Sequence, residues 1–354
     1  MRYVSADHLM EGMVLGKPFY GRTGDLMLRE GMVLTTTLVE RIRNLRYSGV
    51  YIQDKFSEGI DPEDIISEDL RYNAATSVRR LMASTESEEL TSVDMDGITQ
   101  YVNRILEQIM STKNAIINLV DLKEFDLYTY QHSVNVCVLC CVIGYAYGIP
   151  RKQLLSLAMA SILHDIGKMF VDKKILDKPG KLSPEEFTII KKHSRLGYEC
   201  LEKCGISGSV TDAILMHHER FDGTGYPLGK KGDEVPIFAQ IISIADVFDA
   251  ITSKRSYHEA IVPSEAYEYI LGNAGRHFAP KIVDVFTQKI APFPLGVSVQ
   301  LSNGLEGVVY KNHEGNLTRP VVKLFPLPGQ KGDQFLDLKN DKHALGLTIK
   351  KILI

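Results

Sequence analysis

Two adjacent histidines open a short polar stretch, HHERFDGTGYP, which runs from His217 to Pro227. Neighbouring side chains point about 100° apart on a helix, so both rings serve one site only where the helix ends and its side chains converge. Metal binding is one chemistry that uses such a pair of imidazoles. The doublet therefore directs attention to the other side chains of the chain that bind metals.

Five histidines and two aspartates with this capacity are spread over separate segments of helical character. A single pair such as His164-Asp165 is more often a surface or capping pair than a pair of ligands. Together, however, these polar side chains interrupt packing faces that are otherwise apolar, and buried polar groups need partners. A divalent metal supplies a partner for all of them. The candidate ligands are His132, His164, Asp165, His193, His217, His218 and Asp246.

The mixed ligand set narrows the choice of metal. Imidazole with carboxylate suits iron, manganese, nickel or zinc, whereas calcium and magnesium prefer shells made of oxygen alone. Seven candidate ligands are too many for one ion. We therefore predict two divalent transition-metal ions per chain, drawn from iron, manganese, nickel and zinc, with Asp165 as a carboxylate that bridges them.

Two motifs carry a resemblance to a known family. HDIGK, at His164 to Lys168, and the HHERFDGTGYP stretch together closely resemble the HD-GYP family, the branch of HD-domain phosphohydrolases that cleaves cyclic di-GMP. Further matches are YTYQHS before the first ligand, ILDKPGKLSPEEFTIIKKHSRLG, ADVFDAITSKRSY and GRHFAPKIVDVF. The resemblance covers about residues 120 to 290.

The resemblance implies how the ligands divide between two ions. One metal is held by His132, His164, Asp165 and Asp246, and the other by Asp165, His193, His217 and His218. It also implies hydrolysis of cyclic di-GMP to linear pGpG, with GMP as a further product. The residues permit this reaction, because a metal lowers the pKa of bound water to about 7 and a hydroxide that bridges two ions attacks phosphorus in line.

Two cations are candidates for the phosphate. Lys168 follows His164 by four residues, so on one continuous helix its ammonium shares the face of the metal ligands and reaches a phosphate oxygen. Arg255, in TSKRSY, is the corresponding candidate for a phosphate clamp. We therefore expect Lys168 to act in catalysis beside Asp165, with Arg255 holding substrate.

The glycine-rich part of the second motif has the composition of a turn, and ordinary loop chemistry explains its glycines without any function. The resemblance implies more, namely a loop that flanks the substrate. In that interpretation Tyr226 contacts the ligand and Asp222 fixes the loop. The substrate-binding residues expected here are Asp222, Gly225, Tyr226 and Pro227.

Three positions depart from the family pattern. Tyr128 stands four residues before His132, where members with a third metal are expected to offer a carboxylate, so we favour two ions. His258 stands where a more basic residue often assists phosphate binding, and Ala279 replaces an aspartate in HFAP. Two other functions therefore stay open: hydrolysis of another cyclic dinucleotide such as cyclic GMP-AMP, and a receptor for cyclic di-GMP with low turnover.

The elements that position these residues are mostly helices, since nearly every segment from Tyr128 to about Ile290 has helical length and periodicity. Ser183, Pro184 and Glu186 occupy the N-cap, N1 and N3 places of a capping box. This box predicts the start of one long helix that carries His193.

The remaining segments have other textures. Residues 1–60 predict a small α+β module with a hairpin at Gly24-Asp25, and residues 61–120 predict connecting helices that begin at Asp61-Pro62. Residues 121–292 form the HD-GYP-like domain, and residues 293–354 alternate strands with turns. We predict a multidomain protein, a central all-α domain between a small α+β module and a small β module.

Composition limits the partners. The net charge of −3 offers no global attraction to a nucleic-acid polymer or an anionic membrane. The most apolar segment, Val134 to Ile149, is shorter than the ~20 residues of a spanning helix and predicts a buried core helix. The start of the chain lacks the apolar core of a signal peptide.

Five cysteines lack metal-finger spacing and are expected to be reduced thiols in or near the core; they are Cys137, Cys140, Cys141, Cys200 and Cys204. This usage favours a cytoplasmic protein. The flanking segments offer surfaces for a homodimer or a signalling partner.

Overall fold

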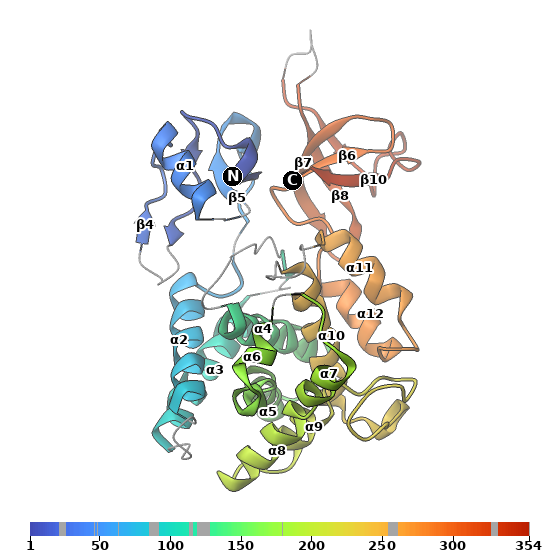
Figure 1. Cartoon of the computed structure of the whole chain (residues 1–354). Coiled ribbons are helices and arrows are strands. Elements are labelled where there is room, and N and C mark those ends of the chain that lie inside the picture. Colours follow the sequence, from blue (N-terminus) through green and yellow to red (C-terminus); the bar gives the residue numbers. More distant parts are fainter. Residues whose placement is uncertain are drawn as a thin grey trace.

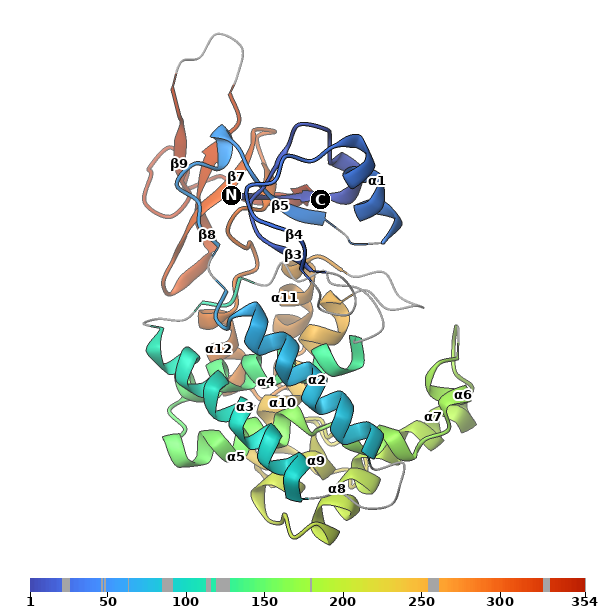
Figure 2. The same ribbon diagram turned by 90° about the vertical axis from the view of Figure 1, so that its left-hand side faces the viewer.

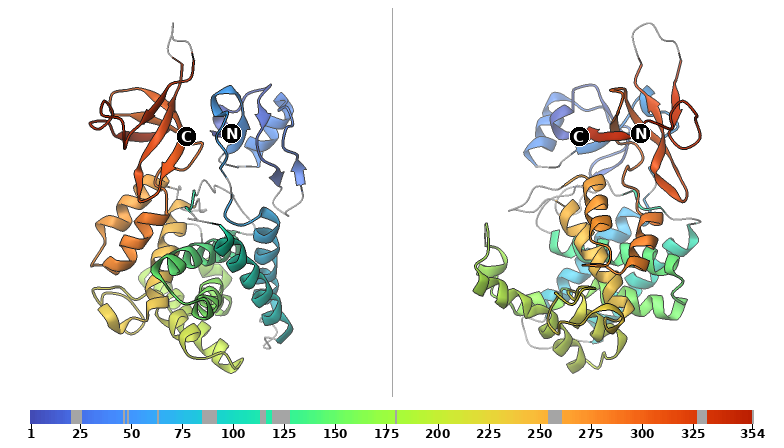
Figure 3. Two further views of the ribbon diagram at one scale, coloured as in Figure 1. Left: turned by 180° about the vertical axis from the view of Figure 1, so that it is seen from behind. Right: turned by 90° about the vertical axis from the view of Figure 1, so that its right-hand side faces the viewer.

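A helical body carries two small β modules, which lie side by side at one end of it (Figure 1). The views in Figures 2 and 3 agree on this arrangement. The computed structural model describes residues 1–20, 26–45, 47, 49–62, 64–84, 92–112, 116–118, 128–178, 180–253, 261–326 and 332–353. Small sheets at both ends of the chain and helices between them agree with the predicted classes of structure.

The N-terminal module combines two small sheets with one helix. Its three-stranded antiparallel sheet has the order β1 (Arg2–Ser5), β5 (Gly49–Gln53) and β2 (Val14–Leu15), and its second sheet pairs β3 (Phe19–Tyr20) with β4 (Leu26–Leu28). Helix α1 (Thr36–Asn44) packs on them through Val39 and Ile42. The predicted hairpin turn at Gly24-Asp25 lies outside the described residues, although the strands on either side of it pair.

Two helices, α2 (Glu68–Ser84) and α3 (Ser92–Ser111), follow this module. The prediction that the first of them begins at Asp61-Pro62 is wrong, since α2 begins at Glu68. Leu70, Val78 and Ile105 of this pair are fully buried in the same core as the later helices. That burial against α4 and α5 makes the pair part of the helical body.

The other helices of the body are α4 (Tyr128–Tyr147), α5 (Arg151–Ile162), α6 (Lys173–Leu176), α7 (Pro184–Lys191), α8 (His193–Lys203), α9 (Ser209–Met216), α10 (Ile237–Thr252), α11 (Pro263–Gly272) and α12 (Pro280–Lys289). Helix α4 is the predicted buried helix, and α2, α5, α10 and α12 surround it. Its residues from 132 to 144 are mostly buried, whereas Tyr145 and Tyr147 at its end are exposed. An apolar helix covered on all sides explains why α4 has no polar face.

The capping box at the start of α7 is confirmed, because the Ser183 side chain accepts from Glu186 N and the Glu186 carboxylate accepts from Ser183 N. The prediction of one continuous helix from this box is wrong. The chain breaks at Lys192, and α8 begins at His193. A close approach accompanies the break: a Cβ on Gly167 would lie 1.9 Å from His193 O, so only glycine fits there.

The C-terminal module is a five-stranded antiparallel sheet with the order β10-β6-β7-β8-β9. Its strands are β6 (Ser298–Leu301), β7 (Glu306–His313), β8 (Asn316–Leu324), β9 (Phe335–Asp337) and β10 (Ile349–Leu353). It contacts the N-terminal module directly, since Tyr3 N donates to Gly296 O at 2.8 Å and the Phe56 ring meets the Phe325 ring edge-on.

All five cysteines are free thiols. Cys137, Cys140 and Cys141 are buried in α4, as predicted, but Cys204 is exposed because it caps the C-terminus of α8. Among the described residues, no helix is both long enough and apolar enough to cross a membrane.

Candidate metal centre

The seven predicted ligands meet inside the helical body, although they come from five different places in it. His132 lies on α4, and Asp246 lies on α10. His164 and Asp165 lie in the turn after α5, and His193 is the first residue of α8. His217 and His218 follow the last residue of α9, as expected for a doublet that serves one site.

These side chains form three overlapping groups in which the ligand atoms lie within 4.8 Å of one another. One group is His132, His164 and Asp246, another is His193, His217 and His218, and the third is His164, Asp165 and His217. The structure therefore separates the histidines into two sets.

Asp165 lies between the two sets and turns one oxygen toward each. Its Oδ2 lies 3.3 Å from His164 Nε2 and 3.8 Å from His132 Nε2, and its Oδ1 lies 3.5 Å from His193 Nε2. The side chain is 1% exposed, so bulk solvent does not reach it. This is the geometry required of a bridging carboxylate.

Backbone carbonyls fix the tautomer of three histidines. The Nδ1 atoms of His164, His193 and His217 lie 2.7, 2.7 and 2.6 Å from the carbonyl oxygen three residues earlier in the chain. A carbonyl oxygen only accepts hydrogen bonds, so each Nδ1 carries the hydrogen. Each Nε2 therefore presents its lone pair to the interior of the site.

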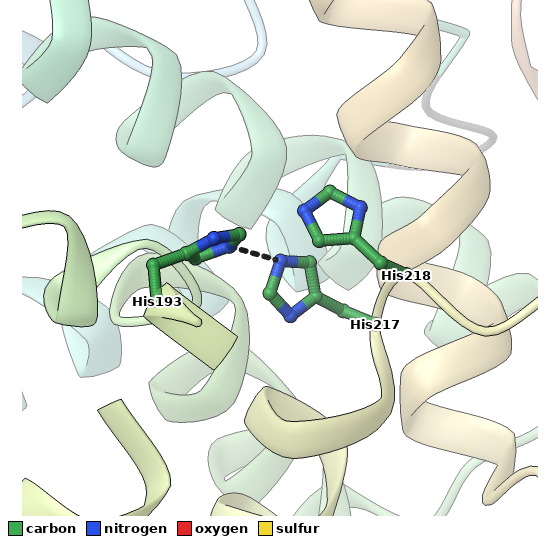
Figure 4. A group of neighbouring side chains, drawn as sticks. All are labelled: His193, His217 and His218. Atoms are coloured by element: carbon green, nitrogen blue, oxygen red, sulfur yellow. Dashed lines mark hydrogen bonds between the residues drawn. The ribbon is translucent and has the colours of Figure 1, made fainter. Parts of the chain in front are cut away.

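The lone pairs so directed meet without a hydrogen between them. His193 Nε2 and His217 Nε2 are 3.3 Å apart (Figure 4), and burial lowers the pKa of both imidazoles, which keeps them neutral. Among the described residues, His164 Nε2 and Asp165 Oδ1 are buried and make no hydrogen bond. Buried lone pairs that face one another require a cation, so these residues fit a metal ion.

The charge states also fit metal ligands. Burial by itself raises the pKa of Asp165, but the Lys168 ammonium and His164 outweigh it and hold the pKa well below its usual range. The same holds for Asp246, where His132 is the main opposing group. Burial lowers the pKa of His218 to about 3. Both aspartates are thus anionic and His218 is neutral near pH 7.

Asp249 is a functional residue that the sequence interpretation missed. Its Oδ2 accepts from His132 Nδ1 at 2.6 Å, and its Oδ1 accepts from Asn135 Nδ2 at 2.9 Å. A carboxylate behind a metal-binding imidazole orients the ring and strengthens it as a ligand. The available signal was the spacing Asp246-x-x-Asp249, which places both carboxylates on one face of a helix.

The turn after the histidine doublet packs against the site. The Tyr226 ring stacks on the His218 ring, and Asp222 Oδ1 accepts from Thr224 N at 2.9 Å, which shapes the turn. Gly225 passes so close to Glu219 that a Cβ would lie 2.4 Å from Glu219 Cα. Pro227 follows through a cis peptide bond.

Glu219 is a second residue that the sequence interpretation missed. It is 2% exposed, and its Oε1 accepts from Leu228 N at 2.6 Å and from Gly229 N at 3.1 Å. The carboxylate therefore closes the loop by holding its far end. Its place directly after the doublet was the available signal.

Lys168 reaches the site by a different path from the one predicted. Helix α5 ends at Ile162, before His164, and Lys168 lies in a separate 3₁₀ helix, Ile166–Phe170. His164 and Lys168 therefore share no continuous helix face. The tighter backbone still brings Lys168 Nζ to Asp165 Oδ2 at 2.5 Å, with the side chain 28% exposed. The ammonium thus lies at the edge of the centre, in contact with the Asp165 carboxylate.

The three departures from the family pattern have different outcomes. His258 lies outside the described residues, as does Arg255, the expected phosphate clamp, which is not one of the three departures. Tyr128 is the first residue of α4, but its side chain also lies outside the description. Ala279 is buried at the N-cap of α12 and packs in the core.

Comparisons with known proteins identify similar sequences. A family model for the HD domain matches residues 106–282. A Pseudomonas aeruginosa protein named cyclic di-GMP phosphodiesterase is 37% identical over 247 residues, 68% of this chain and 59% of its own length. The 3′3′-cGAMP-specific phosphodiesterase 2 of Vibrio cholerae is 34% identical over 196 residues, 54% of this chain and 38% of its own length.

A solved structure, described as a HDG"Y"P protein from Bdellovibrio bacteriovorus, matches with a TM-score of 0.46 and 20% identity over 80% of this chain and 97% of its own. The chain spans 59% and 38% of the two curated relatives named above, so it matches only part of each.

Proposed function

The chain belongs to the HD domain family, and from this premise we propose that it is a metal-dependent phosphodiesterase that hydrolyses cyclic di-GMP to linear pGpG, with GMP as the product of continued hydrolysis. The printed name of the Pseudomonas aeruginosa relative supports this substrate. The intact GYP sequence at Gly225, Tyr226 and Pro227 supports it as well.

One observation carries the proposal: Asp165 turns its two oxygens toward two separate sets of buried histidines. In this proposal His132, His164, Asp165 and Asp246 hold one ion, and Asp165, His193, His217 and His218 hold the other. When bound, two divalent ions such as iron or manganese supply Lewis-acid charge and an activated water near neutral pH. The buried helices keep bulk water away, and backbone carbonyls fix the direction of His164, His193 and His217.

The chain's own residues supply the rest of the chemistry. In the proposal Lys168, with its partly exposed side chain beside Asp165, offsets negative charge on the phosphate as the transition state forms. Tyr226 borders the nucleotide with the ring face turned away from His218, and Asp222 and Glu219 hold the loop in shape. Arg255 remains our proposed phosphate clamp.

The test is a turnover assay combined with elemental analysis. The full chain is purified without oxygen, reconstituted with iron or manganese, and incubated with cyclic di-GMP. We expect close to two ions per chain and the appearance of pGpG before GMP. Cyclic di-GMP that stays intact although two ions are bound per chain would falsify the proposed reaction.

Cyclic GMP-AMP is a second candidate substrate, because the Vibrio cholerae relative carries that nucleotide in its name. The same assay with each dinucleotide in separate reactions decides between them by kcat/KM. Tight binding of cyclic di-GMP with no product from either dinucleotide supports the remaining hypothesis, a cyclic di-GMP receptor with low turnover.

The surroundings of the enzyme are part of the proposal. We place it in a reducing cytoplasm, supported by its five free thiols. We also propose that the two terminal modules, residues 1–60 and 293–354, receive a signalling partner or a second copy of the chain. Limited proteolysis and light scattering of the full chain test the boundaries and the oligomeric state.

A further inference from the structure

A cavity of about 150 Å³ lies between the N-terminal module and the helical body, far along the chain from the histidine doublet. The strands of the module form one wall, and α2 and α4 form the other; Figure 2 shows the module seated over the end of α2. The metal centre does not use this cavity, so it needs an explanation of its own.

Aromatic rings form the wall on the module side. The rings of Tyr3 and Tyr51 meet edge-on with their centroids 5.7 Å apart, and the ring centroids of Phe19 and Tyr47 lie 4.5 Å apart. The Tyr47 hydroxyl also donates to Tyr20 O at 2.8 Å. Ring contacts and hydrogen bonds hold these side chains in place, so the cavity is formed before any ligand arrives.

Size and charge define the ligand. A cavity of about 150 Å³ is large enough for a benzene ring, and the aromatic side chains of its wall favour a ring in edge-to-face geometry. The charged residues of the lining balance, because Lys17 and Arg71 stand against Asp64 and Glu68. We propose that the cavity binds an uncharged molecule with one aromatic ring and a polar substituent, and that its occupancy is transmitted to the metal centre.

A chain of hydrogen bonds connects the cavity with a metal ligand. Arg71 of α2 and Asn135 of α4 both line the cavity, and the Arg71 guanidinium donates to Asn135 Oδ1. Asn135 Nδ2 donates to Asp249 Oδ1 at 2.9 Å, and Asp249 Oδ2 accepts from His132 Nδ1 at 2.6 Å. Three hydrogen bonds therefore lead from the cavity wall to an imidazole of the centre.

The chain of contacts gives the coupling a physical route. A polar substituent in the cavity competes for the donors of Arg71 and Asn135, which changes how firmly Asn135 holds Asp249. Asp249 in turn sets the orientation of the His132 ring. Any effect of the ligand on metal affinity must be matched by an equal effect of the metal on ligand affinity. Neither effect depends on which phosphodiester is cleaved.

Binding is tested on the full chain with phenol as the probe and 2-naphthol as the oversized control. We expect phenol to bind in a calorimetric titration and 2-naphthol not to bind. Ile65→Phe, which fills the cavity from a half-buried position near α2, abolishes phenol binding, as does Tyr51→Trp from the opposite wall. Ile206→Phe, at a half-buried isoleucine away from the cavity, leaves phenol binding unchanged.

Coupling is tested by titrating Mn²⁺ into the protein with and without saturating phenol, in the absence of nucleotide. We expect the Mn²⁺ affinity to change by about fivefold or more. Asn135→Leu removes this dependence, whereas Asn103→Leu, at an exposed position on α3, preserves it. Failure of phenol to bind, an unchanged Mn²⁺ affinity, or coupling that survives Asn135→Leu each overturns the proposal. Because no nucleotide is present, none of these results bears on the proposed reaction.

Discussion

Tyr226 stacks on His218, with ring centroids 4.8 Å apart and ring planes inclined by 29°. The residue expected to contact substrate therefore touches a residue expected to bind metal. Lys191 Nζ also lies 5.2 Å from the centroid of the Tyr226 ring. One aromatic ring thus links the loop, the centre and a nearby cation.

Tyr226→Ala should weaken binding of cyclic di-GMP by ~1 to 3 kcal/mol, the contribution of a base stacked on an aromatic side chain. Calorimetric titration of metal-loaded protein, slowed by Lys168→Ala, measures it. Tyr226→Phe keeps the ring and should keep most of the affinity. An unchanged affinity after Tyr226→Ala, at equal metal content, would leave the loop with a structural role alone.

Asp165→Ala should remove both ions together, because each carboxylate oxygen faces a different set of histidines. Asp246→Ala is the matched comparison, since its Oδ1 lies 3.1 Å from His132 Nε2, whereas its Oδ2 approaches the other set more loosely, at 3.9 Å from His218 Nδ1. Elemental analysis after reconstitution should find almost no metal in the first variant and about one ion in the second. Retention of one ion by Asp165→Ala contradicts the bridging role.

Lys168→Ala should keep the metals and slow hydrolysis by roughly ten- to a thousand-fold, the scale for removing one preorganised charge from a transition state. Removing an ammonium next to Asp165 takes away a competing cation, so metal content stays the same or rises. Lys174→Ala, at an exposed lysine of α6, should leave the rate unchanged. Collapse of the metal content in Lys168→Ala would show that the assigned role is wrong.

Asp249→Ala should weaken metal binding by about 10- to 100-fold, as expected when a carboxylate behind a ligating imidazole is lost. The His132 ring then loses the carboxylate that holds its Nδ1. Asp284→Ala, on α12, serves as the control for a change of net charge. Equal Mn²⁺ affinities of the two variants would contradict the positioning role of Asp249.

Metal affinity should rise with pH up to about pH 9. Burial lowers the pKa of His132, but hydrogen bonds to Asp246 and Asp249 outweigh it and raise that pKa to about 9. A metal must displace this proton, so binding below pH 9 releases about one proton per chain. Calorimetric titration with metal, repeated in buffers of different ionisation enthalpy, measures the number of protons released. His132→Ala should abolish the release.

The raised pKa also affects the metal-free fold. Its folded-state value lies above the ordinary value of 6.5, so protonated His132 stabilises the metal-free protein fully below about pH 6.5. This contribution disappears as the pH rises through 9. Thermal unfolding of metal-free wild-type protein and of His132→Ala should therefore converge at high pH.

The sequence predicted the convergence of the seven side chains well, because ligand chemistry restricts which residue types assemble in an apolar interior. His217 and His218 illustrate this, since their adjacency alone required a helix end. The path of Lys168 was not predictable from spacing. A change from α to 3₁₀ geometry after Ile162 depends on tertiary packing, in which Gly167 meets the backbone of α8.

Asp249 and Glu219 show a second limit of sequence reasoning. Both are acidic residues beside stronger candidates, and their roles appear only as hydrogen-bond partners of His132 and of the loop backbone. The start of α2 at Glu68 shows a third, because a Pro after an Asp is compatible with a helix start and with an extended linker. Asp64 in this stretch forms an ion pair with Lys17 of the N-terminal module at 2.8 Å, a contact that local propensity does not reveal.

The three imidazoles that are hydrogen-bonded to backbone carbonyls make the orientation of these ligands resistant to mutation. Side-chain substitutions leave main-chain oxygens in place, so the direction in which His164, His193 and His217 point is insulated from most point mutations. By contrast, the hydrogen bond on His132 Nδ1 goes to a side chain, the carboxylate of Asp249, and not to a main-chain oxygen. Substitutions that change the metal affinity of the centre without replacing a ligand, in natural or directed evolution, should therefore occur mainly on α10, where Asp249 lies.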